Sequence, residues 1–479
     1  MAASLVYALW GYNNLKLTLS MFKYLSFALL LILSFSSCKK DNTDDTLYFN
    51  TIAAQVQTSN SLRVDVEVSL VQSSSCYIEY WKETDGTKIS KTKEVNTGSS
   101  AKFTLVLLEA ATKYQYRVVA NTPSGKVEST AYSFTTGKLP SDLELLKCRV
   151  KSNELKDELG GYILRSQRSD PGYIMILNTM GEILWYNKMN KQVWIATFDS
   201  LTNTISCIIG EDKNQIWAGE EIRVVDLLGN ILFTKSTPER PPHHDVRRLP
   251  NGNLLVVNFV PRAFDLTSRG GTANEIVVGD GYTIYDMQGN IVEQWDCFDT
   301  LNPADDPEVM AHLNDWLHVN SINYDPQGNF YLTPNMRNEL WKIDTKTKKV
   351  VYRLGIDGNV KVDPNGFCFG LHSVEPIDGT RVLVLDNGYT QKRTRALVYS
   401  VDEKNLTATV EQATVFPSLY HSPYMSNAQF ISDKLMIYGS TMSNSALITD
   451  YDGNVLRILF SDKYQSYRSL YIPEISPLY

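Results

Sequence analysis

A short motif recurs between residues 138 and 479 and restricts what this part of the chain can form. An apolar run typically ends in Asp or Asn, two residues follow, and Gly then precedes a second apolar run, as in "VVDLLGNILF" and "NYDPQGNFYL". Asp or Asn caps the start of a tight turn, and Gly takes the positive φ that the turn requires. The motif therefore predicts β-hairpins with turns at Gly181, Gly229, Gly252, Gly289, Gly328 and Gly453.

These hairpins predict the fold class. Residues 138–479 consist of short strands separated by turn signals, with almost no helical periodicity. This pattern is typical of a β-propeller, for which we favour six blades within a range of about five to eight. The chain is therefore expected to be all-β.

Residues 47–137 predict a separate β-sandwich of about seven short strands. The stretch "SLRVDVEVSL" alternates polar and apolar residues, as a half-buried strand does. Leu108, Thr112 and Tyr114 have the spacing of a tyrosine corner, in which the phenol hydroxyl bonds to the backbone upstream. The segment resembles a fibronectin type III or similar immunoglobulin-like sandwich, and we expect no chemistry from it.

The first residues resemble an export signal. From Met21, which we take as the true start, a basic residue, an apolar run and small residues lead to Cys38. "FSSC" resembles a bacterial lipobox, so residues 1–38 are predicted to end in a lipidated Cys38, with residues 39–46 as a polar tether. The expected location is the bacterial cell envelope, periplasmic or on the surface, and the expected membrane contact is this lipid anchor. An ordinary secretory signal is the alternative.

Composition excludes some partners. The 479-residue chain has a formal net charge of -7 and no marked run of Lys and Arg, whereas nucleic-acid binding needs a clustered basic surface.

Neither CxxC nor HExxH occurs, and the turn "TDYDGN" lacks the downstream Glu of a calcium loop, so no metal site is predicted. Five cysteines follow Cys38, and buried free thiols are the simplest expectation, with one disulfide left open. A monomer and a homodimer both fit the sequence.

Six histidines are the main candidates for chemistry. His243 and His244 stand at the entry to a predicted strand, so successive side chains point to opposite faces and only one reaches a central channel. Asp245 follows them and could orient an imidazole. His312 and His421 lie in less regular segments, and we expect structural roles for both.

A second set of residues suggests an anion site. His318 and Asn320 are two residues apart and share a face of the next predicted strand, and Arg337 follows on its partner strand. A histidine, an amide and a guanidinium that converge on one point can bind an oxyanion. His372 has a similar position before a later strand.

Taken together, these segments resemble one known family. The runs "HHDVRRLPNGNLL" and "DWLHVNSINYDP", Arg337 before "NELWKID", the "GLH" segment and "LDNG" are similar in order to the bacterial arylsulfate sulfotransferases. The resemblance covers residues 140–479 and implies a six-bladed propeller that acts as the catalytic domain. Members of that family move a sulfuryl group from a phenolic sulfate ester to a phenol through a sulfohistidine. They do not use the nucleotide donor PAPS, and no cofactor is expected.

The resemblance also implies residue roles. His372 matches the nucleophile, and His318, Asn320 and Arg337 match groups that bind the sulfuryl oxygens or assist proton transfer. One of His243 and His244 matches a further active-site histidine, and we favour His244.

Two positions depart from the family pattern, and one rival function remains. Asn335 stands where members often have Ser, and Ser373 where they often have an acidic residue. The rival function is a non-catalytic surface propeller lipoprotein that binds a sulfated or anionic glycan or partner protein.

Overall fold

The computed structural model describes residues 48–143, 145–150, 155, 159–211 and 218–476. The predicted signal region (residues 1–38), Cys38 and the tether (residues 39–46) lie outside the described residues. The described part contains strands and short 3₁₀ turns and no α-helix, which confirms the all-β prediction. No helix among these residues is long and apolar enough to span a membrane.

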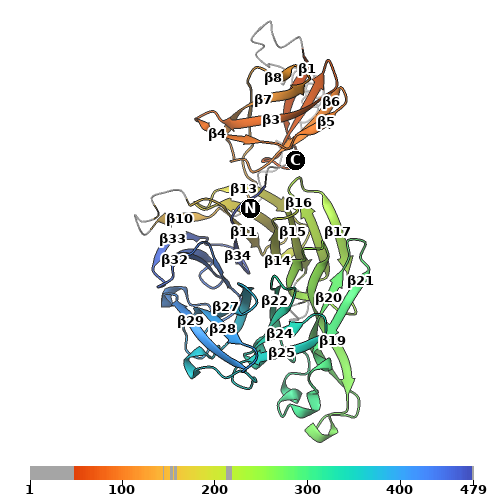
Figure 1. Cartoon of the computed structure of the whole chain (residues 1–479), viewed down its shortest axis with the longest axis vertical. Coiled ribbons are helices and arrows are strands. Elements are labelled where there is room, and N and C mark those ends of the chain that lie inside the picture. The colour runs from red at the N-terminus through yellow and green to blue at the C-terminus, as the bar shows by residue number, and fades with distance from the viewer. Residues whose placement is uncertain (1–47, 144, 151–154, 156–158, 212–217, 477–479) are drawn as a thin grey trace, which may run out of the picture. The chain divides into compact units, whose positions relative to one another are not determined.

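Residues 49–135 form two antiparallel sheets (Figure 1). One has three strands, β1 (Phe49–Val56), β2 (Val64–Leu70) and β6 (Ser100–Leu105). The other has six, β3 (Ser74–Lys82), β4 (Asp85–Lys91), β5 (Val95–Thr97), β7 (Lys113–Thr122), β8 (Gly125–Glu128) and β9 (Tyr132–Thr135).

The interior of this region follows the predicted alternation. In β2, Val64, Val66 and Val68 are buried, because alternate side chains of a strand face the same side. The Tyr114 hydroxyl accepts a hydrogen bond from the Glu109 backbone nitrogen at 2.9 Å, which is the upstream contact expected of its spacing. The immunoglobulin-like assignment itself stays a prediction.

Six further antiparallel sheets lie between residues 147 and 472 and give the region a propeller-like arrangement (Figure 1). For each sheet the innermost strand is given first. The first three sheets contain β34 (Ser469–Ile472), β11 (Tyr162–Gln167), β12 (Tyr173–Asn178) and β13 (Ile183–Lys188); β14 (Gln192–Asp199), β15 (Thr204–Gly210), β16 (Glu221–Asp226) and β17 (Ile231–Ser236); and β18 (Pro242–Arg248), β19 (Leu254–Phe264), β20 (Glu275–Tyr285) and β21 (Ile291–Asp296). The other three contain β22 (Val319–Tyr324), β23 (Phe330–Pro334), β24 (Leu340–Asp344) and β25 (Lys349–Leu354); β26 (Leu371–Pro376), β27 (Arg381–Asp386), β28 (Arg395–Asp402) and β29 (Thr407–Val415); and β30 (Asn427–Phe430), β31 (Leu435–Ser440), β32 (Ser445–Asp450), β33 (Val455–Phe460) and β10 (Lys147–Val150).

The first strands of these sheets line the centre of the arrangement. β14 contacts β18, β18 contacts β22, β22 contacts β26, β26 contacts β30, and β30 contacts β34. The first sheet is completed by β34, which pairs with β11 so that Tyr162 faces Ile472. Residues from both ends of this region thus share one sheet.

The turn motif behaves as predicted. All six of its glycines have positive φ, between 84° and 91°. In four of the turns the first Asp accepts a hydrogen bond from the backbone nitrogen of the Asn four residues later at 2.8 Å, as for Asp226 and Asn230. The Gly453 turn, which resembled a calcium loop, joins β32 to β33.

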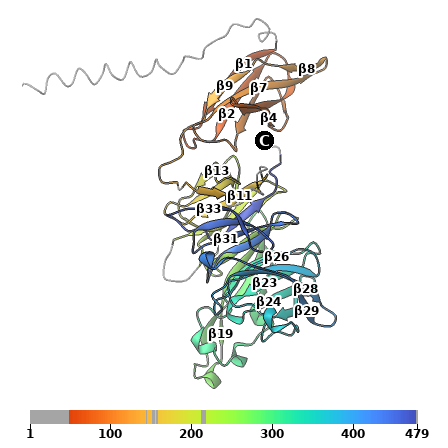
Figure 2. The ribbon, with the colours of Figure 1, turned by 90° about the vertical axis from the view of Figure 1, so that its left-hand side faces the viewer.

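Two details complete the fold. β19 and β20, each of 11 residues, form a hairpin that extends beyond the neighbouring sheets (Figures 1 and 2). The 3₁₀ turns are η3 (Thr267–Arg269), η4 (Cys297–Asp299), η5 (Pro303–Asp305), η6 (Val309–Ala311), η7 (Asn335–Arg337), η8 (Pro364–Gly366) and η9 (Ser418–Tyr420). The five described cysteines are all free thiols, so the disulfide that the sequence left open does not form among them.

Candidate active site

A cavity of about 1200 Å³ opens at the end of the inner strands and is lined by His244, His318 and His372. His244 and His372 lie at irregular points of β18 and β26, and His318 directly precedes β22. His244 and His318 have left-handed backbones, with φ of 53° and 54°. His372 is the extra residue of a β-bulge, because the register of β26 shifts between Leu371 and Ser373. Such irregularities redirect side chains, and here they bring three histidines from three sheets to one place.

The two adjacent histidines have different surroundings. His244 lines the cavity, whereas His243 is fully buried and stacks on Phe259, with ring centroids 3.9 Å apart. The Nδ1 atoms of the two rings are 2.8 Å apart. The carboxylate beside His243 is Asp280, whose Oδ1 lies 3.2 Å from Nε2 without hydrogen-bond geometry, and not Asp245 as the sequence suggested.

His318 carries a carboxylate partner. Its Nδ1 lies 2.5 Å from Asp315 Oδ2, and its ring centroid lies 4.7 Å from that of His244. Burial disfavours the charged imidazolium, but the hydrogen bond and the charge of Asp315 outweigh burial and raise the pKa of His318. His318 is therefore the histidine of the cavity most readily protonated near neutral pH.

His372 has the opposite tendency. The pKa of His372 is lowered to about 3, mainly because the ring is buried and further because of the charges of His318 and Arg468. Its Nδ1 lies 3.5 Å from the carbonyl oxygen of Gly370. The pKa of His244 is also lowered well below its usual value, first by burial and then by His318. The cavity thus combines two neutral imidazoles with one that favours the charged form.

The other predicted site residues lie beside the cavity. Asn320 is fully buried and donates its amide to the carbonyl of Leu371 at 2.8 Å, while its Oδ1 has no partner. Arg337 lies in η7, the turn after β23, and not on that strand as predicted. It donates to Asp306 Oδ2 at 2.8 Å and lies over the ring of Trp316. Neither side chain is among the described residues that line the cavity.

The remaining sequence features also have clear places. Asn335 lines the cavity and donates to the same Leu371 carbonyl at 3.3 Å. The Ser373 hydroxyl accepts a hydrogen bond from the Ala428 backbone nitrogen at 3.3 Å. His421 lies 3.0 Å from the Thr394 hydroxyl, and neither it nor His312 belongs to the described cavity lining.

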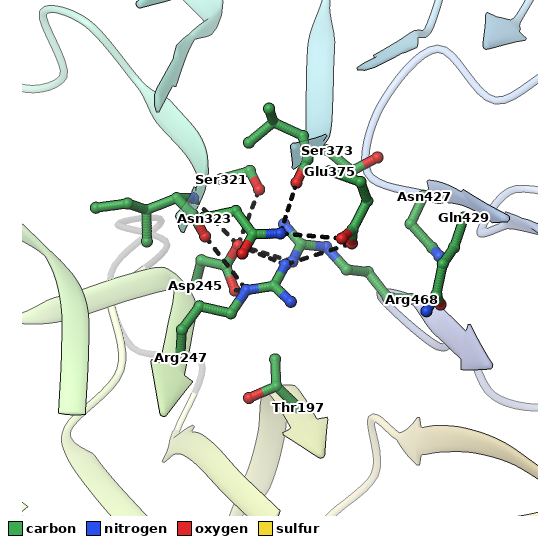
Figure 3. Close-up of polar contacts among 12 residues, drawn as sticks. Thr197, Asp245, Arg247, Ser321, Asn323, Ser373, Glu375, Asn427, Gln429 and Arg468 are labelled. Carbon is green, nitrogen blue, oxygen red and sulfur yellow. Dashed lines mark hydrogen bonds and ion pairs between the residues drawn. The ribbon is translucent and has the colours of Figure 1, made fainter. Parts of the chain in front are cut away.

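A buried ionic network is formed around Asp245, the residue after His244 (Figure 3). The Arg468 guanidinium, with its side chain 1% exposed, donates to Asp245 Oδ2 at 2.8 Å. The same oxygen accepts from the Ser321 hydroxyl at 2.9 Å, and Arg247 Nε lies 3.3 Å from Asp245 Oδ1. These donors and charges outweigh the cost of burial and lower the pKa of Asp245. Sequence reasoning missed Arg468, since nothing near "SYRSLYIP" distinguishes it from an ordinary strand residue.

The cavity mouth carries exposed apolar groups. Tyr389 is 67% exposed, Met336 46% and Tyr424 41%, and all three line the cavity. Exposed aromatic faces at a concave site suit a planar aromatic ligand. Arg168 and Lys463 are the only Arg or Lys among the described lining residues, which include no Asp or Glu. The described residues hold no cluster of His, Cys, Asp and Glu that could bind a metal ion.

The cavity therefore offers a neutral imidazole as a nucleophile, an imidazolium as an acid, aromatic surfaces and no carboxylate in its described lining. This combination suits transfer of an anionic group between aromatic alcohols.

The chain was compared with solved structures, with curated sequences and with models of protein families. Three solved structures are similar to the chain at low identity: a protein of unknown function from Bacteroides caccae (12% identity, 66% of this chain and 100% of that chain, TM-score 0.42), an auxiliary nutrient binding protein from Bacteroides thetaiotaomicron (10%, 88% and 90%, 0.34) and virginiamycin B lyase from Staphylococcus aureus (12%, 66% and 98%, 0.31). A search of curated protein sequences finds no match. The model of the arylsulfotransferase (ASST) family matches residues 146–469. Because this match spans more than half of the chain and includes all three cavity histidines, the chain belongs to the arylsulfotransferase family.

Proposed function

We propose that this protein is a PAPS-independent aryl sulfotransferase that moves a sulfuryl group from a phenolic sulfate ester to a phenolic acceptor. One observation carries the proposal: His244, His318 and His372 line a single cavity, and His318 and His372 have pKa shifts in opposite directions. Membership of the arylsulfotransferase family supports the reaction class.

In the first half-reaction, a neutral ring nitrogen of His372 attacks the sulfur of the donor. The bond between sulfur and the phenolic oxygen breaks, and the leaving phenolate takes a proton from the His318 imidazolium. Free phenols have a pKa of about 10, so this proton assists departure. The products are a sulfohistidine at His372 and a free phenol.

In the second half-reaction, His318 is neutral and accepts the hydroxyl proton of the incoming phenol. The phenolic oxygen attacks the sulfur, and the bond between sulfur and His372 breaks. Donor and acceptor use the same aromatic mouth in turn. The low pKa of His372 keeps its nitrogen available as a nucleophile and as a leaving group.

Sulfuryl transfer, like phosphoryl transfer, has a loose transition state with negative charge on the equatorial oxygens. We assign the stabilisation of that charge to His318 and His244, and to Asn320 and Arg337 as the family resemblance implies. Arg337 would serve this role only when its guanidinium is directed from Asp306 toward the cavity.

We further propose that the six sheets are six propeller blades and that the N-terminal strands form an immunoglobulin-like sandwich. The sequence around Cys38 supports export and lipid anchoring in the bacterial cell envelope. A homodimer is compatible with these proposals.

The activity is tested with purified protein, p-nitrophenyl sulfate as the donor and phenol as the acceptor. We expect phenol-dependent release of nitrophenol that is lost in His372→Ala and retained in the control His421→Ala. Absence of turnover across a range of aryl sulfates and phenols would favour a non-catalytic anion-binding propeller. Turnover that needs no phenol would indicate a hydrolase.

A further inference from the structure

One buried guanidinium contacts β18, β22 and β26, the three strands that contain or directly follow the cavity histidines. Arg468 precedes β34, and its Nη1 donates to Asp245, the neighbour of His244 in β18, at 2.8 Å. Its Nη2 donates to the carbonyl oxygen of Asn320 in β22 at 3.0 Å and to that of His372 in β26 at 3.3 Å. Figure 3 shows the guanidinium among side chains from these separate strands.

The two backbone acceptors lie at irregular points of their strands. The register of β22 shifts between Val319 and Ile322, and that of β26 shifts at His372. Carbonyl groups at such irregularities lack regular ladder partners, so a fixed donor is needed to hold them. Arg468 is that donor at both places.

We infer that Arg468 is a positioning residue that sets the relative placement of His244, His318 and His372 by binding the three strands that contain or directly follow them. The effect of Arg468 on turnover rests on the proposed function, because it is measured as sulfotransferase activity. Arg468 does not line the cavity among the described residues, so it acts through the histidines.

The geometry explains why the residue is arginine. A planar guanidinium presents several donors in fixed directions, so it can bond a carboxylate and two carbonyls at once, whereas an ammonium is a compact point charge. The charged groups around it are Asp245, Arg247 and Glu375, and the Tyr467 ring lies 5.3 Å from its guanidinium carbon. Arg468 also contributes to the lowered pKa values of His244 and His372.

The test compares Arg468→Lys and Arg468→Met with Arg457→Lys. Arg457 is a matched control because it is also buried, 3% exposed, and donates to a backbone carbonyl, that of Thr179, at 2.9 Å. We expect both Arg468 variants to lower kcat about 100-fold, a loss that a misplacement of about 1 Å can cause, with KM for p-nitrophenyl sulfate within about 3-fold. Arg457→Lys should keep kcat within about 3-fold.

A second readout does not depend on activity. Histidine-selective ¹⁵N NMR follows the six imidazoles, and the signals lost in His244→Ala and His372→Ala identify the two rings. In Arg468→Met, both should titrate at higher pH than in the wild type, with a smaller change in Arg468→Lys and none in Arg457→Lys.

The outcomes separate the two proposals. Folded Arg468 variants with kcat within about 3-fold of wild type would overturn the inference, and so would a loss of kcat with unchanged histidine titrations, which indicates general structural damage. If the wild type shows no turnover, the proposed function fails, and the role of Arg468 is then decided by the ¹⁵N shifts of His244 and His372 in Arg468→Lys, measured at a pH where both rings are neutral. This variant keeps the charge, so changed shifts support the positioning role and unchanged shifts overturn it.

Discussion

His318 Nδ1 lies 2.5 Å from Asp315 Oδ2, and this contact turns one histidine of the cavity into its acid. His244, only 4.7 Å away between ring centroids, has no such carboxylate contact described and has a lowered pKa. The difference in charge between neighbouring imidazoles therefore comes from a residue three positions before His318.

Asp315→Asn should lower the pKa of His318, because it removes the negative charge that favours the imidazolium and leaves only a neutral amide oxygen as the acceptor. The acid would then lose its proton at lower pH, so the alkaline limb of the kcat/KM profile moves down by about one pH unit or more. The profile is measured with p-nitrophenyl sulfate and phenol. Asp305→Asn, an exposed change nearby, should leave the limb in place, and an unshifted limb in Asp315→Asn would contradict the assigned role of His318.

Mild acid should destabilise the protein through His244 and His372. Both pKa values are lowered in the folded state, that of His372 to about 3, so below about pH 6.5 only the unfolded chain gains these protons. His372 should then cost about 1.6 kcal/mol of unfolding free energy between pH 6.5 and 5, and His244 should add a loss in the same direction. His318 affects stability above this pH range. Because its pKa is raised in the folded state, its stabilising contribution is complete below about pH 6.5 and is lost as the pH rises through its folded pKa.

Urea unfolding at several pH values measures this effect. His372→Asn should clearly reduce the dependence of the unfolding free energy on pH between pH 6.5 and 5, while His421→Asn, outside the cavity lining, should reduce it much less. An unchanged slope in His372→Asn would show that His372 does not hold its lowered pKa.

Tyr389→Ala should weaken substrate binding more than chemistry. The side chain is 67% exposed at the cavity mouth, so its removal costs little stability but takes away an aromatic surface. We expect KM for the aryl sulfate to rise about 5- to 10-fold, with kcat within about 3-fold. The control is Leu201→Ala, 76% exposed on the turn after β14, which should change neither constant.

Two glycines test the turn motif. Gly252 and Gly453 share a φ of 85°, so alanine is strained at both and should cost about 1 kcal/mol. A Cβ at Gly453 would also lie 2.2 Å from the Val415 carbonyl oxygen, whereas at Gly252 the nearest atom is in the Arg248 side chain at 3.7 Å. Thermal unfolding should therefore show a larger loss for Gly453→Ala than for Gly252→Ala, and equal losses would contradict this packing.

The sequence was most informative where structure depends on neighbouring residues. The Asp and Gly of the turn motif act within five residues, so their hairpins could be predicted without a tertiary model. The three histidines that the sequence grouped do line one cavity. Their charge states could not be predicted, because they depend on burial and on contacts across sheets.

Long-range polar contacts were beyond sequence reasoning. Asn320 and Arg337 matched a family motif, yet their side chains bond to Leu371 and Asp306, which only the folded arrangement brings near. Arg468 is separated from Asp245 by 223 residues, and no local pattern relates the two. A motif identifies residue types, while the direction of each side chain is set by the packing of neighbouring strands.

The pairing of β34 with β11 has a consequence for synthesis. The first sheet stays incomplete until residues 469–472 leave the ribosome, because they supply its channel-side strand. Contacts between such distant residues make folding slow, since the intervening chain must be ordered before they form. A nascent chain that lacks these residues exposes an unpaired β11 edge, and such an edge can pair with another chain until β34 covers it.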